Sequence, residues 1–160
     1  MLLSVAFLIS IASFAQPDHK ASPHDTVTTK NIKVTYGRPY KKGRDIFGGL
    51  EKFGEVWRCG ADEATEITFA KDGMFGGKSI KAGSYTLFVK PTATEWTIII
   101  NGDPHFWGTQ YADHKAKDVL SVTVPVKNLD TVVDQLTIRF AGSNMIIEWD
   151  KTQVSIPVSF

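Results

Sequence analysis

The chain has 160 residues, with 18 Lys and Arg against 17 Asp and Glu, which gives a formal net charge of +1. This length is that of one domain, and a charge so close to zero excludes the overall positive field that favours nucleic acid. Its single cysteine, Cys59, excludes an intrachain disulfide. No phosphate-binding loop, nucleophile elbow or other complete catalytic or cofactor motif occurs, so we expect no nucleic-acid partner and no cofactor.

Residues 1–15 are almost wholly apolar or small and end in Ser13-Phe14-Ala15. Small residues at positions 13 and 15 suit signal peptidase, and the run is shorter than the roughly 20 residues that span a bilayer. We therefore expect a signal peptide of residues 1–15, with a buried apolar strand or helix as the alternative. No later apolar run is long enough to span a membrane, so we expect an exported protein, periplasmic or secreted, whose mature chain has no transmembrane segment.

Residues 16–25 are polar, contain Pro17 and Pro23, and are predicted to form an N-terminal arm. Beyond the arm, apolar residues recur at every second position, which is the period of a strand that buries one face. This pattern lies within a single domain of residues 26–160. The runs that show it are residues 32–36, 66–69, 85–90, 96–100, 120–126, 136–140, 145–149 and 154–160.

Turn signals such as Asp72-Gly73 and Asn101-Gly102 separate these runs. Eight or more short strands at this spacing predict an all-β fold, a single-domain antiparallel β-sandwich with a jelly-roll-like arrangement. Residues 96–100 are apolar on both faces, as in a central strand of a covered sheet. Residues 45–53 and 110–117 are candidates for one or two short helical turns in loops.

The first group of candidate site residues lies between the first two predicted strands of the domain. Arg38, Lys42 and Arg44 stand there among glycines and a proline. An Arg side chain presents a planar fork that suits carboxylate or phosphate, so these residues are candidates for an anion-binding loop. The alternative is a solvated basic loop whose arginines pair with Asp62 and Glu63.

The second group lies in residues 55–65 and comprises Trp57, Arg58, Asp62 and Glu63. Charged groups crowded beside a tryptophan form either an interior ion pair, which is costly to break, or a site. In a site, the carboxylates of Asp62 and Glu63 would accept sugar hydroxyls or act as acid and base. Cys59 lies in the same stretch and is expected to be a small buried residue, although the neighbouring Arg58 would favour its thiolate.

The four tryptophans divide into two pairs. Trp96 and Trp149 lie in alternating strand patterns and are expected in the core, whereas Trp57 and Trp107 lie in loop-like segments and are the better candidates to contact a ligand. His105 and His114 lie near aspartates, but their spacing matches no metal-binding motif, so we expect no metal site.

Several motifs together carry a family resemblance that covers nearly all of the mature chain. They are Tyr36-x-Arg38-Pro39, Lys42-Gly43-Arg44-x-Ile46-Phe47-Gly48, Val56-Trp57-Arg58-x-Gly60-Ala61-x-Glu63-Ala64-Thr65 and Trp107-Gly108. In these residues the chain resembles the bacterial secreted family known as domain of unknown function twenty-nine eleven. The resemblance implies export in a Gram-negative bacterium and no established reaction. Cys59 and Asp62 stand where the family pattern has Thr and Asn, so the resemblance places no nucleophile at position 59.

Three functions remain open. We favour a non-catalytic secreted β-sandwich that binds a small polar or anionic ligand, such as a glycan, through some of the residues named above. The first alternative is a structural or assembly module of the cell envelope, with Arg58 and Glu63 in a buried network. The second alternative is a hydrolase that uses Glu63 or Asp62 as general base. The sequence identifies neither catalytic residues nor an oligomeric state.

Overall fold

The computed structural model of the chain describes residues 22–160, so the expected signal peptide and most of the expected arm lie outside the described residues. Within them, the regular structure is mainly β-strand. The elements in chain order are β1 (His24–Thr28), β2 (Ile32–Gly37), β3 (Thr65–Phe69), β4 (Gly73–Phe75), β5 (Lys78–Ile80), β6 (Gly83–Pro91), β7 (Glu95–Asn101), η1 (Gly108–Gln110), α1 (Tyr111–His114), η2 (Lys115–Lys117), β8 (Asp118–Ala141) and β9 (Asn144–Ser159).

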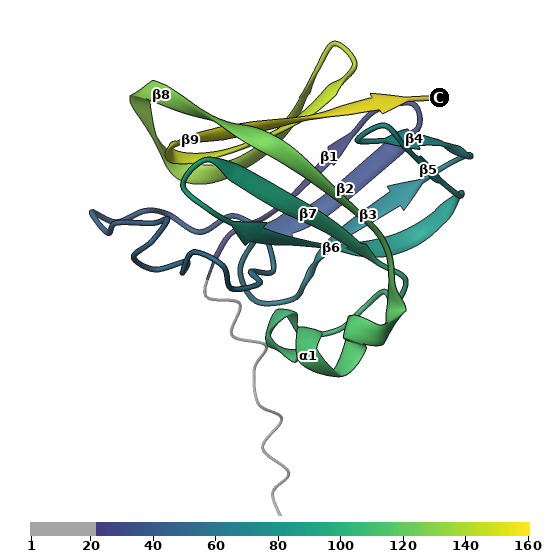
Figure 1. Cartoon of the computed structure of the whole chain (residues 1–160), viewed down its shortest axis with the longest axis horizontal. Helices are drawn as coiled ribbons and strands as arrows, with labels where there is room; N and C mark the ends of the chain where they lie inside the picture. The colour runs from purple at the N-terminus through teal and green to yellow at the C-terminus, as the bar shows by residue number, and fades with distance from the viewer. Residues whose placement is uncertain (1–21) are drawn as a thin grey trace, which may run out of the picture.

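The described strands form one sheet in the order β1-β2-β3-β6-β7-β8-β9-β4-β5, with antiparallel neighbours. The first part of β8, as far as Pro125, pairs with β7, and the part from Val126 onward pairs with β9. Figure 1 shows the long β8 and β9 lying over the layer that contains β1, β2, β3, β6 and β7. The expected all-β, sandwich-like fold is therefore confirmed, as one antiparallel sheet that turns back over itself.

Aromatic residues fill the interior between the layers. Trp96 on β7 and Trp149 on β9 are fully buried, as expected from their alternating patterns. The ring of Phe47 lies between them, with centroid distances of 4.7 Å to Trp96 and 6.3 Å to Trp149. Across the interior, the backbone N–H of Ile138 on β8 donates to the hydroxyl of Tyr36 on β2 at 2.8 Å. Aromatic packing and this hydrogen bond thus hold the two layers together.

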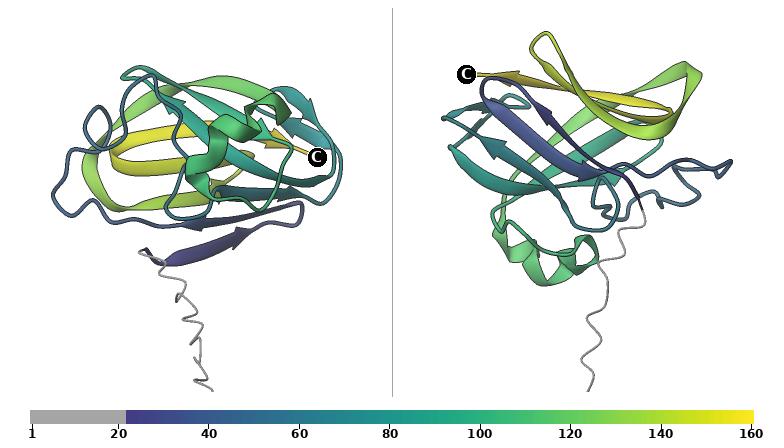
Figure 2. Two further views of the ribbon diagram at one scale, coloured as in Figure 1. Left: turned by 90° about the horizontal axis from the view of Figure 1, so that it is seen from below. Right: turned by 180° about the vertical axis from the view of Figure 1, so that it is seen from behind.

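The outer face of the central strands is also covered. Ile99 on β7 and Phe88 on β6 form a second, smaller cluster, and Phe106 and Tyr111 pack against it. Figures 1 and 2 show α1 on this outer face, below β6. The expected covered central strand and the expected helical turn within residues 110–117 are therefore confirmed. Within residues 22–160, no helix combines the length and apolar character needed to cross a bilayer.

Some local expectations need correction. Residues 45–53 form turns instead of a helix, because Gly48 has a φ of +86°, in the left-handed region. The runs at 120–126 and 136–140 belong to one strand, β8. The polar stretch between them stays in the strand because shifts in the register with β9 accommodate it. The same is true of 145–149 and 154–160 in β9, which ends at Ser159. The alternation did not predict β1, β4 or β5, and β1 begins at His24, inside the expected arm.

Candidate functional site

A short pairing of two loops builds the candidate site. The N–H of Ala64 donates to the carbonyl of Phe106 at 3.1 Å, and the N–H of Gly108 donates to the carbonyl of Asp62 at 3.2 Å. These bonds flank an antiparallel bridge between Glu63 and Trp107. Two motifs separated by more than forty residues in the sequence are thereby brought side by side at the end of β2 and the start of β3.

Trp57 lies in the core and is only 5% exposed. Its backbone exchanges two hydrogen bonds with Val89 at the end of β6, which directs the side chain inward. The ring stacks on Trp149 at 5.9 Å, and its Nε1 donates to the carbonyl of Gly60 at 3.3 Å. The structure thus places Trp57 in the packing beneath the site and away from solvent.

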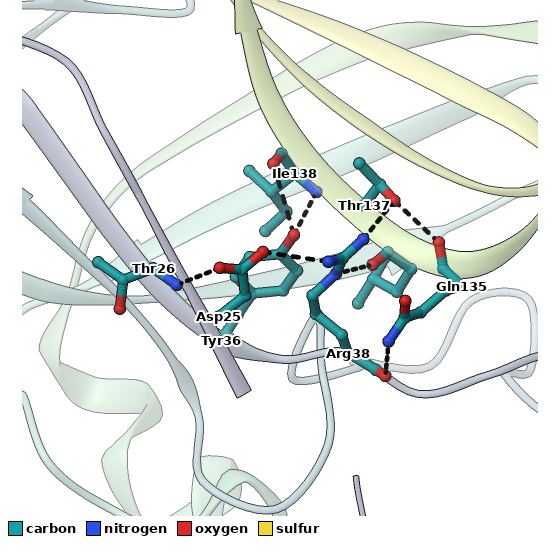
Figure 3. A network of polar contacts seen from close by, with 8 residues as sticks. Asp25, Thr26, Tyr36, Arg38, Gln135, Thr137 and Ile138 are labelled. Atoms are coloured by element: carbon teal, nitrogen blue, oxygen red, sulfur yellow. Dashed lines mark hydrogen bonds and ion pairs between the residues drawn. The ribbon is translucent and has the colours of Figure 1, made fainter. Parts of the chain in front are cut away.

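Arg38 joins three strands, and each of its three guanidinium nitrogens contacts a protein partner (Figure 3). Its Nη1 lies 3.1 Å from the carboxylate of Asp25 on β1, and its Nε donates to the Leu136 carbonyl on β8 at 3.1 Å. Its Nη2 donates to the Thr137 hydroxyl, also at 3.1 Å. Hydrogen bonds from a charged donor are among the stronger ones, so Arg38 stabilises the contact of β1 and β2 with β8.

Four of the expected site residues line one pocket of about 320 Å³, which we call the basic pocket. All four belong to the long connection between β2 and β3, with Lys42 and Arg44 in its first part and Arg58 and Asp62 near its end. Glu51 also lines this pocket, as do the exposed side chains of Tyr40 and Leu50. Three cations therefore face two carboxylates within one cavity.

Arg58 is fixed in the basic pocket by a glycine from the neighbouring loop. A Cβ atom added at Gly108 would lie only 2.0 Å from Cδ of Arg58 and 2.7 Å from its Cβ, so the arginine stem packs directly on the glycine backbone. The Nε atom of Arg58 is buried and, among the described residues, has no hydrogen-bond acceptor. A buried donor without an acceptor is costly, so the stem of Arg58 is held on Gly108 at a cost in stability.

Glu51 is the unexpected ionisable group of the basic pocket. Burial raises the pKa of its carboxyl from the ordinary 4.5 to about 7, and the nearby Arg58 and Arg44 oppose this rise. Near neutral pH the carboxyl is therefore partly protonated and can donate a hydrogen bond. Protonation also leaves the basic pocket with a larger excess of positive charge.

Glu51→Gln is expected to raise the free energy of unfolding at alkaline pH. Because the folded pKa, about 7, lies above the ordinary 4.5, Glu51 favours folding fully below about pH 4.5 and loses this contribution as pH rises through 7. The glutamine cannot ionise, so the free energy of unfolding of the variant should exceed that of the parent by about 1–3 kcal/mol at pH 8.5 and equal it at about pH 4. Urea unfolding at both values measures this difference. Glu55→Gln, at an exposed position nearby, is the control, and an equal gain there would contradict the assignment to Glu51.

The other two expected site residues, Glu63 and Trp107, line a second cavity of about 470 Å³, which we call the tryptophan pocket. Trp107 is 45% exposed. Nε2 of His24 lies 3.1 Å from Glu63 Oε2 and 3.9 Å from Asp62 Oδ2. Nδ1 of His105 lies 2.5 Å from Oε1 of Glu66, which projects from β3 into the same pocket. Two imidazole–carboxylate pairs thus line one cavity.

Left-handed backbone conformations concentrate around the two pockets. Lys42, Cys59, Asp62 and His105 are non-glycine residues with φ values of 50°, 52°, 67° and 62°. Each such residue costs on the order of 1–3 kcal/mol and persists only where its surroundings enforce it. Strain of this kind is typical of ligand sites, and here it fixes the directions in which Lys42, Asp62 and His105 project.

The remaining candidates have structural environments. Cys59 is fully buried, as expected, and burial raises the pKa of its thiol despite the adjacent arginine. His114 stacks on Phe106 at 3.8 Å and contacts the Asp103 carboxylate at 2.9 Å. Within residues 22–160, no three His, Cys, Asp or Glu side chains are arranged to hold a metal ion.

Sequence reasoning did not single out His24, Glu51 or Glu66 as site residues. His24 looked like part of a solvated arm, and Glu66 like an ordinary solvent-facing residue of an alternating strand. Glu51 lies in a turn that resembled a short helix. Only the pairing of the two loops places these side chains in pockets, and local sequence carries no signal for that pairing.

Comparison with known proteins supports the family resemblance of the sequence motifs. No curated protein and no solved structure matches the chain significantly. A family model described as "Protein of unknown function (DUF2911)" matches residues 17–158, which include both pockets. The chain therefore belongs to the DUF2911 family of proteins of unknown function.

Proposed function

We propose that this protein is an exported, non-catalytic β-sandwich that binds a small anionic ligand, such as an acidic glycan, in the basic pocket. One observation carries the proposal: Lys42, Arg44 and Arg58, which lie in two parts of the connection between β2 and β3, line a single cavity of about 320 Å³. Export follows from the apolar character of residues 1–15, and the ligand would be met in the periplasm or the medium.

The charges of the basic pocket support an anion over a neutral ligand. Asp62 and Glu51 partly balance the three cations, but the raised pKa of Glu51 reduces its negative charge near pH 7. Arg44 is exposed and uses its Nε and Nη2 to hold the carbonyls of Lys41 and Tyr40, at 2.9 and 2.6 Å. These bonds orient the guanidinium before a ligand arrives, so the Arg44 side chain loses less conformational entropy when the ligand binds.

A titration of D-galacturonate tests the proposal, with uncharged D-galactose as the comparison. Galacturonate should bind more tightly than galactose, and binding should weaken as salt is added. The double variant Lys42→Gln, Arg44→Gln should weaken galacturonate binding by about ten-fold or more, because it removes two charge-assisted contacts. Isothermal titration calorimetry at low ionic strength measures these affinities.

Lys33→Gln is the matched control, because Lys33 is an exposed lysine on β2 and lines neither pocket. The affinity of the Lys33→Gln variant for galacturonate should equal that of the parent protein. The proposal fails if galacturonate and galactose bind equally, if galacturonate does not bind, or if the double variant retains full affinity. Thermal unfolding of each variant separates loss of binding from loss of fold.

A further inference from the structure

The tryptophan pocket contains an aromatic ring, that of Trp107, which is not packed in the core. Of the four tryptophans, Trp57, Trp96 and Trp149 are at most 5% exposed, whereas Trp107 is 45% exposed. Within residues 22–160, the other three pack against aromatic rings, and Trp107 has no such ring contact. A large exposed ring beside a cavity is typical of a ligand platform.

The backbone of Trp107 is held in place by several contacts. Its backbone N–H donates a hydrogen bond to Oε1 of Gln110 at 3.2 Å. Its carbonyl accepts the N–H of Gln110 at 2.9 Å, and the bridge to Glu63 ties it to the loop before β3. The neighbouring His105 has a left-handed φ of 62°. A fixed backbone limits the region in which the indole can lie, which lowers the entropic cost of binding a partner there.

Polar acceptors surround the platform. Oε1 of Glu66 is engaged by His105, and a carboxylate has acceptor capacity beyond one such contact. Glu63 pairs with Trp107 through the backbone bridge, and its carboxylate contacts His24. An apolar ring face next to oriented carboxylates and imidazoles complements a sugar, which has an apolar C–H face and a rim of hydroxyl donors.

The tryptophan pocket adjoins the basic pocket. Pro23 lines the basic pocket and the next residue, His24, lines the tryptophan pocket. In the same way, Asp62 lines the former and Glu63 the latter. Successive residues on two different segments therefore line different pockets, which places the two pockets on either side of the same short stretches of backbone.

We infer that the tryptophan pocket is a second subsite for the same ligand, in which a sugar ring stacks on Trp107 while an acidic group of a neighbouring sugar occupies the basic pocket. The ligand class is then an acidic oligosaccharide. This inference rests on the proposed function, because the acidic group is assigned to the basic pocket, but it adds a site that an isolated anion would not need.

Binding of tri-galacturonic acid tests the inference, with two readouts. Calorimetry gives the affinity, and acrylamide quenching of tryptophan fluorescence reports mainly on Trp107, since the other three indoles are buried. The trisaccharide should protect Trp107 from the quencher and bind more tightly than D-galacturonate. Trp107→Ala should weaken its binding by about ten-fold, whereas Trp107→Phe, which keeps an aromatic face, should lose less. Phe160→Ala removes an exposed aromatic that lines neither pocket and should have no effect.

The outcomes distinguish failure of the inference from failure of the proposed function. If Trp107→Ala binds the trisaccharide as well as the parent does, while the Lys42, Arg44 double variant does not bind it, the second subsite is wrong and the basic pocket stands. If the trisaccharide protects Trp107 and its affinity is unchanged in that double variant, the basic pocket is wrong. If the trisaccharide does not bind the parent protein, both are wrong.

Discussion

Trp57→Ala is expected to lower the free energy of unfolding by about 3–5 kcal/mol, as large-to-small changes of buried aromatics do. The indole is 5% exposed, and its truncation would leave a cavity between Trp149 and Trp96, whose ring centroids lie 5.9 and 6.1 Å away. It would also remove the hydrogen bond from Nε1 to the Gly60 carbonyl. Urea unfolding followed by circular dichroism measures the loss.

Trp107→Ala is the matched control for this prediction, because the same chemical change occurs on a ring that is 45% exposed. Its cost should stay below about 1 kcal/mol, as for most surface substitutions. Equal costs at positions 57 and 107 would contradict the division into one core tryptophan and one available to ligand. The comparison also indicates whether Trp107 can be altered in binding experiments without unfolding the protein.

The fold was largely predictable because burial on one face imposes alternation on a strand. Ile32, Val34 and Tyr36 follow this rule and lie on β2 with their side chains buried. Short strands escape it: β4 and β5 have three residues each, too few to establish a period. The strand order depends on contacts between distant segments, so it could not be read from local sequence.

The candidate site was predictable only in part, because the type of a residue does not reveal the direction in which its side chain points. Arg38 and Arg44 looked equivalent in the sequence, yet Arg38 joins β1, β2 and β8 while Arg44 lines the basic pocket. Trp57 and Trp107 both lay in irregular segments, but the pairing of Trp57 with Val89 directs its ring into the core. The motif around Glu63 is thus partly architectural and partly a pocket wall.

Gly108→Ala is expected to disturb the basic pocket although residue 108 carries no charge. The added Cβ would meet Cδ, Cβ and Cγ of Arg58 at 2.0, 2.7 and 2.9 Å, all well inside contact distance. Because two of these atoms lie near the arginine backbone, a change of side-chain rotamer cannot relieve the whole overlap. We expect a stability loss of about 1–3 kcal/mol, typical of overpacking, and weaker galacturonate binding as Arg58 is displaced. Urea unfolding and calorimetry measure the two effects.

A double-mutant cycle with Arg58→Ala separates this mechanism from a general effect of alanine in a turn. Arg58→Ala removes Cγ and Cδ, so adding Gly108→Ala should then cost clearly less stability than it does in the parent protein. Gly102→Ala is the control, because a Cβ there would meet its nearest atoms, the Lys117 carbonyl oxygen and Val119 Cγ1, only at 3.3 Å. Additive costs in the cycle, or an equal loss of binding in Gly102→Ala, would contradict the packing of Arg58 on Gly108. A non-additive result would mean that the glycine of the Trp-Gly motif at 107–108 fixes Arg58 in the basic pocket, while the tryptophan of the same motif lines the other pocket.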